Sequence, residues 1–91
     1  AWENKRLLLG ESMPREDEAE LRELVAGWDG VDHVVDFRTV YFGPEKIVVM
    51  ADVRFVEDLD TGEIDDRITA IEDGIIADQP SVRKVYIEPE I

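Results

Sequence analysis

The chain has 91 residues, 44% of them hydrophobic and 36% charged, which fits one small folded domain and excludes a disordered acidic tail. It contains no cysteine, so disulfides, thiol catalysis and cysteine-ligated zinc are excluded. Its net charge of −13 repels nucleic acid and anionic lipid, and no apolar run is long enough to cross a bilayer.

Residues 1–12 form a leading segment in which basic Lys5 and Arg6 precede three leucines. Because the chain opens on Ala1 rather than Met, we expect it to be a piece of a larger protein.

The next element is a predicted helix over residues 14–26. Its signals are a first-turn proline, three acids that follow it, an apolar stripe at helical spacing, and a glycine as C-cap: Pro14, Glu16, Asp17, Glu18, Leu21, Leu24, Val25 and Gly27.

Two strands are predicted next, over residues 31–42 and 47–55, joined by a turn at 43–46. In the first strand β-branched and aromatic residues share one parity, at Val31, Val35, Phe37 and Tyr41. The second strand alternates cleanly and turns one fully apolar face to the core. Its other face carries Val48, Met50, Asp52 and Arg54, a mixture that predicts partial cover by something else.

A second helix is predicted over residues 61–78, where isoleucines step by four, three and four positions between acidic residues. Asp60 and Glu63 have the spacing of a capping box, and Pro80 ends the helix. A last strand is predicted over residues 82–88, stopped by Pro89.

The element order helix, strand, strand, helix, strand predicts an α+β two-layer sandwich of the ferredoxin or metallochaperone kind. We expect a three-stranded mixed sheet with both helices on one face. The third strand should run parallel to one of the first two, through a right-handed crossover.

No arrangement typical of an enzyme is present, so we predict no catalytic residues, no small-molecule substrate and no firm cofactor. Neither serine has a visible base, and carboxylate pairs are expected by chance among 23 Asp and Glu residues. His33 is the only imidazole, and a lone histidine beside Asp32 and Asp36 is most often a surface residue. Two interpretations of the acidity stay open: a generally acidic, salt-adapted surface, or a field that attracts cations.

Three stretches together carry a resemblance that covers nearly the whole chain: NKRLLLGES at 4–12, DFRTVYFGPEKIVVMADVRF at 36–55 and PSVRKVYIEPEI at 80–91. In their order and spacing they resemble the C-terminal cytoplasmic domain of the cation diffusion facilitator family. The resemblance implies efflux of Zn²⁺ or a similar divalent cation, usually by proton antiport, through a membrane domain that precedes this chain.

On this resemblance, residues 1–12 link to the absent membrane domain, and residues 13–91 form a dimerisation and regulatory domain on the cytoplasmic side of the cell membrane. The partners implied are a second copy of the chain and the membrane domain of the same protein. The surface predicted to contact the second copy contains Val48 and Met50, on the second face of strand 47–55.

The resemblance also implies where metal would bind. Zinc-binding members carry histidines at positions that correspond to Val35, Asp52, Asp65 and Glu88, none of which is histidine here. The remaining candidates are Asp52, Glu88, Glu90 and Asp65, with His33 as an outside candidate. Because Zn²⁺ prefers nitrogen or sulfur among its ligands, we expect zinc sensing to be weak, altered or absent.

A free-standing small-molecule regulatory module or metal-delivery protein of the same fold is the alternative. A metal-delivery protein would carry Cys or His ligands in a loop, which this chain lacks. A regulatory module would need a pocket at its dimer interface.

Overall fold

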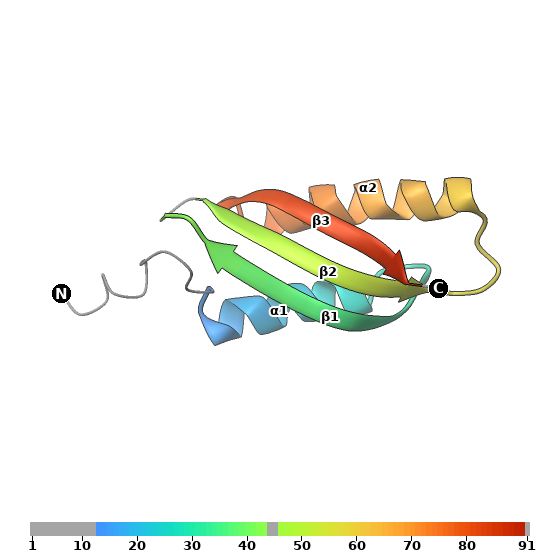
Figure 1. The fold of residues 1–91 in the computed structure, drawn as a ribbon, viewed down its shortest axis with the longest axis horizontal. Helices are drawn as coiled ribbons and strands as arrows, with labels where there is room; N and C mark the ends of the chain where they lie inside the picture. The colour runs from blue at the N-terminus through green and yellow to red at the C-terminus, as the bar shows by residue number, and fades with distance from the viewer. Residues whose placement is uncertain (1–12, 44–45, 91) are drawn as a thin grey trace.

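The computed structural model describes residues 13–43 and 46–90, which form two layers. The elements are α1 (Arg15–Ala26), β1 (Val31–Tyr41), β2 (Ile47–Phe55), α2 (Thr61–Asp78) and β3 (Val82–Glu90). The sheet order is β1-β2-β3, with β1 antiparallel and β3 parallel to β2. Both helices lie on one side of the sheet (Figure 1). The predicted α+β fold, with its mixed sheet, is confirmed.

Helix α1 follows the sequence signals closely. It begins after Pro14, and three acids in its first turn lie at the positive end of the helix dipole. Leu21 and Val25, one turn apart, are fully buried. The helix ends at Gly27, whose N–H donates to the carbonyl of Glu23 at 3.0 Å.

The hairpin places strand β2 at the centre of the sheet. The alternate residues Ile47, Val49, Ala51, Val53 and Phe55 are all buried against the helices, as the alternation predicts. At the turn, Phe42 N–H donates to the carbonyl of Lys46 at 2.8 Å and closes the hairpin. The predicted turn residues Pro44 and Glu45 lie outside the described part of the chain.

Strand β1 departs from the predicted parity. Its register with β2 shifts between Val31 and His33 and again between Val34 and Asp36, so two extra residues are inserted. Each bulge reverses which side the following residues face. Val34 therefore packs against the core, whereas the side chain of Val35 is 48% exposed. The prediction that Val35 shares one side of the strand with Phe37 is wrong for this reason.

Helix α2 begins with the predicted capping box. Glu63 N–H donates to Asp60 Oδ1 at 2.8 Å, and Asp60 N–H donates to Glu63 Oε1 at 2.9 Å. Two of the four stepped isoleucines, Ile71 and Ile75, are fully buried, and the other two pack against the core. Four isoleucines therefore hold this helix on the sheet.

Strand β3 is longer than predicted, because it passes through Pro89 and ends at Glu90. Pro89 lies opposite Val53 in the register with β2. β3 is an edge strand, and proline is tolerated at sheet edges, where fewer backbone N–H groups are needed for pairing. The prediction that Pro89 stops the strand is therefore wrong.

The two ends of the domain differ in what they carry. The hairpin turn and the start of α1 lie at one end, and the C-terminal end of β3 lies at the other (Figure 1). Met13, just before α1, is buried, and its N–H donates to Thr39 Oγ1 near the hairpin end of β1 at 3.2 Å. Within residues 13–43 and 46–90 no helix is long and apolar enough to cross a membrane.

Candidate functional site

The side of the sheet opposite the helices, which we call the uncovered face, is the candidate site. Strand register arranges its side chains in rows across β1, β2 and β3. Starting from the hairpin end, the rows are Val40, Val48 and Lys84; Arg38, Met50 and Tyr86; Asp36, Asp52 and Glu88; and His33, Arg54 and Glu90.

The half of this face near the hairpin is apolar, and we call Val40, Val48, Met50 and Tyr86 the apolar end. The three aliphatic residues are half-buried by neighbours within the sheet, and Tyr86 is 52% exposed. The Lys84 ammonium lies 5.8 Å from the centre of the Tyr86 ring, a distance typical of a cation–π contact. Contiguous exposed apolar surface with a charged rim is typical of protein-contact sites.

The next row consists of acids on all three strands, and we call Asp36, Asp52 and Glu88 the carboxylate row. Side chains directly opposite on neighbouring strands have Cβ atoms roughly 5 Å apart, a spacing at which like charges destabilise a sheet. A hollow of about 330 Å³ joins this row to the apolar end. Its lining is Arg38, Met50, Ala51, Asp52, Tyr86 and Glu88.

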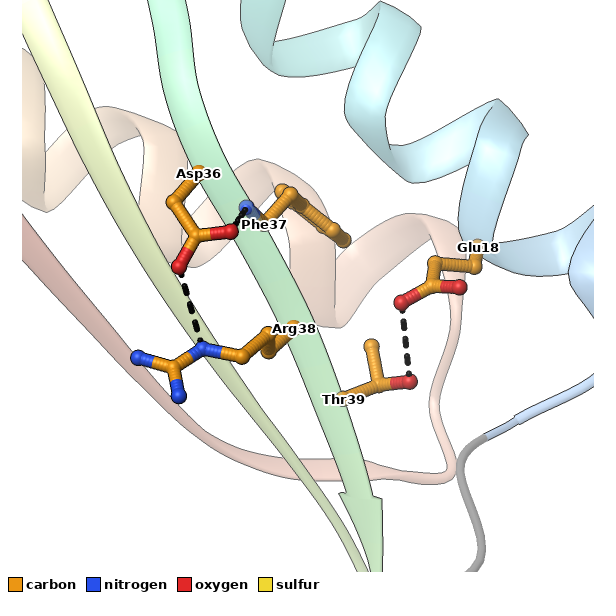
Figure 2. Close-up of polar contacts among 5 residues, drawn as sticks. All are labelled: Glu18, Asp36, Phe37, Arg38 and Thr39. Carbon is orange, nitrogen blue, oxygen red and sulfur yellow. Dashed lines mark hydrogen bonds and ion pairs between the residues drawn. The ribbon is translucent and has the colours of Figure 1, made fainter.

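Asp36 is the member of the row with a defined partner. Its Oδ2 lies 3.1 Å from Arg38 Nε, and its Oδ1 accepts from Phe37 N–H at 3.0 Å (Figure 2). Both charged side chains are largely exposed, so the ion pair contributes little stability. The pair instead fixes the position of one carboxylate beside the hollow.

The opposite side of β1 carries a different polar contact. Thr39, 5% exposed, donates from Oγ1 to Glu18 Oε2 at 3.3 Å (Figure 2). The same hydroxyl accepts from Met13 N–H. Through these two hydrogen bonds, Thr39 connects the start of α1 to β1, the strand that carries Arg38 and Asp36 on its uncovered side.

The candidate metal ligands are only partly brought together. Asp52 and Glu88 are neighbours in register, and Glu90 lies one row further on, opposite Arg54. His33 lies in that last row, with its Nδ1 2.8 Å from Asp32 Oδ2. Asp65 is an exposed residue of α2, which packs on the other side of the sheet. Among the described residues, no group of three or more His, Cys, Asp or Glu side chains is arranged to hold a metal ion.

Sequence reasoning missed Asp36, Arg38 and Tyr86 as members of this face. A signal for Asp36 was available, because pairing Tyr41 with Ile47 across the hairpin and counting back places Asp36 opposite Asp52. No comparable count places Glu88, because the register of a parallel strand depends on the packing of α2.

The helix layer is much more acidic than the uncovered face. Helix α1 carries five Asp or Glu against two Arg, and α2 carries six against one. Where the two helices approach, a hydrogen bond with Asp78 and its negative charge raise the pKa of the Glu20 carboxyl. Glu20 is fully exposed, so this pair marks the density of charge on the helix layer rather than a separate site.

The fold matches that of solved structures of another protein. No family sequence model and no characterised relative matches the chain. A nickel form of a variant MamM C-terminal domain has a TM-score of 0.77 and 13% identity, and covers 85% of this chain and 96% of that chain. A cadmium form has a TM-score of 0.76 and 13% identity, and covers 84% of this chain and 94% of that chain. A copper form has a TM-score of 0.75 and 13% identity, and covers 82% of this chain and 92% of that chain.

MamM is a cation diffusion facilitator protein, so these neighbours come from the family that the sequence resembles. An identity of 13% establishes the fold, and the expectation drawn from the sequence is confirmed at that level. The chain has the fold of a cation diffusion facilitator C-terminal domain.

Proposed function

We propose that this chain is the cytoplasmic dimerisation and regulatory domain of a divalent-cation efflux transporter of the cation diffusion facilitator family. The observation that carries the proposal is the uncovered face, on a fold shared with MamM C-terminal domains. The three stretches that carry the resemblance in sequence support the same family. The domain regulates transport by coupling two copies of the chain, and it performs no catalysis of its own.

The apolar end supports pairing with a second copy. An exposed aromatic beside three half-buried aliphatic side chains gains free energy when a matching surface excludes water. A second copy offers the same surface, and a two-fold arrangement buries both at once. The helix layer is a poor alternative interface, because its acids repel the acids of another copy.

The position of Met13 supports coupling to a preceding membrane domain. The chain enters the fold at the hairpin end, and the first residue described is fixed to Thr39 on the strand that lines the uncovered face. A movement of β1 within the pair would therefore displace the point where the chain enters. Within the described residues, this contact joins the first residue to the strand that carries one edge of the uncovered face.

The donor set supports only weak divalent-metal binding in a single copy. Apart from His33 in the last row, the ligands available on the uncovered face are carboxylate oxygens, which suit hard cations better than Zn²⁺. Neighbours solved in nickel, copper and cadmium forms support divalent-metal binding by this fold. Asp52, Glu88 and Glu90 are the residues proposed to contribute, with His33 and Asp65 outside that group.

A calorimetric titration with Zn²⁺ at neutral pH and high salt, with the mass measured by light scattering before and after, tests the proposal. We expect a dimer without metal and zinc binding weaker than micromolar, reduced further in Asp52→Asn/Glu88→Gln. A monomer under all conditions would contradict the dimerisation role. Saturable binding at micromolar affinity or tighter would contradict the weak metal site.

A further inference from the structure

The rows of the uncovered face change charge along the strands. The two rows nearest the hairpin hold the apolar end with Lys84 and Arg38, and the third is the carboxylate row. Within residues 13–43 and 46–90, neither Asp52 nor Glu88 forms an ion pair. The face is therefore apolar and basic at one end and strongly acidic in the middle.

The relative orientation of two paired copies determines which rows of the uncovered face come into contact. The following step rests on the proposed function, in which both copies hang from one membrane. Each copy must then receive its chain at the same end, the hairpin end where Met13 is bound. The strands run along the length of the domain (Figure 1). With that length directed away from the membrane, a two-fold axis perpendicular to the membrane lies along the strands. Under that symmetry each row faces the same row of the partner.

The apolar end of one copy then meets the apolar end of the other, which favours association. The carboxylate row meets the carboxylate row, which opposes association, because six acidic side chains approach across the interface. Opposition between like charges across an interface weakens binding and is relieved by dissolved ions. Attraction and repulsion therefore act on neighbouring rows of one surface.

We propose that monovalent salt controls the pairing of two copies by screening the repulsion between facing carboxylate rows. Association strengthens as the salt concentration rises. This behaviour is opposite to that of an interface held by salt bridges, which weakens with salt. The ions act by screening and occupy no fixed ligand site, so the effect differs from binding of a divalent metal.

The screening length sets the range over which the effect appears. It falls from about 10 Å at 0.1 M to about 3 Å at 1 M salt, and the second distance is comparable to a contact between side chains. We expect the dissociation constant of the pair to fall on the order of tenfold between about 0.05 M and about 1 M KCl. Most of the change in the dissociation constant should occur before the screening length becomes shorter than the gap between the carboxylate rows of the two copies.

Sedimentation equilibrium over this KCl range tests the proposal with a matched pair of variants. Asp52→Asn/Glu88→Gln removes two charges from the carboxylate row and should leave a dissociation constant that varies little with salt. Glu23→Gln/Asp66→Asn removes the same charge from exposed positions of the two helices and should keep most of the wild-type dependence. Tetramethylammonium chloride, whose cation coordinates oxygen poorly, should act like KCl at equal ionic strength.

This inference would be overturned by association that weakens with salt, by equal loss of salt dependence in both double variants, or by a response to K⁺ that tetramethylammonium does not reproduce. The second result would mean that total charge, rather than the row, controls pairing. A wild-type dimer with no salt dependence overturns the inference alone. A wild-type monomer at every salt concentration overturns the proposed dimer as well.

Discussion

Gly74→Ala is expected to lower the free energy of unfolding by about 1–2 kcal/mol, although alanine is the better helix former. A Cβ built on Gly74 would lie 2.6 Å from Trp28 Cη2 and 2.9 Å from Trp28 Cζ3. Trp28 packs against the core beside α2, so the added methyl group must push the indole out of its place. Loss of that packing outweighs a helix-propensity gain of about 1 kcal/mol.

Thermal unfolding followed by circular dichroism measures this effect, as a fall in Tm of about 4–8 °C per kcal/mol for a domain of this size. The control is the same substitution in a Trp28→Leu background, where the ring is absent. There, Gly74→Ala should stabilise the protein by up to about 1 kcal/mol. If the substitution has the same effect in both backgrounds, contact with Trp28 is not the cause of the destabilisation.

Met50→Glu is expected to weaken pairing of two copies on the order of a hundredfold. Met50 is half-buried in the row that joins Arg38 to Tyr86, at the centre of the apolar end. In the pair the substitution brings two carboxylates into the interface, each at a cost above about 1.4 kcal/mol, which is tenfold in affinity. Sedimentation equilibrium of wild type and variant in the same high-salt buffer gives the ratio of dissociation constants.

Ala70→Glu is the matched control, since it adds the same charge at an exposed position of α2. It should leave the dissociation constant close to that of wild type. Thermal unfolding of each variant shows whether it remains folded. If a folded Met50→Glu variant associates as tightly as wild type, the apolar end is not the interface.

Much of the fold could be predicted because local signals agree with tertiary packing. The capping box at Asp60 and Glu63 and the isoleucine spacing specify α2 almost to the residue. The alternation from Ile47 to Phe55 specifies both the span of β2 and its buried side. In these segments, local preference and the position of the core favour the same conformation.

The errors lie where non-local pairing overrides the local pattern. Alternation counted from Val31 places Val35 on the same side as Phe37, but the two bulges arise only when β1 pairs with β2. Pro89 has the chemistry of a strand terminator, yet the edge position of β3 removes the penalty. Neither feature can be calculated from neighbouring residues alone.

The candidate site was predictable to a smaller extent. The pattern of β2 alone indicated Val48 and Met50 as a second face that needs cover, and the structure places both on the uncovered face. Its extension to Tyr86 depends on the register of β3, which is set by how α2 returns the chain to the sheet. The role of Val48 and Met50 in a dimer interface stays a prediction.

Disulfide trapping is the most direct test of the claim that two copies pair through the uncovered face. The chain has no cysteine, so a single introduced thiol reports on one position. We predict that Val48→Cys, in the apolar end, forms a covalent dimer under mild oxidation, and that Ala70→Cys, on the exposed side of α2, remains monomeric on a non-reducing gel. Efficient cross-linking of Ala70→Cys without cross-linking of Val48→Cys would contradict pairing through the uncovered face.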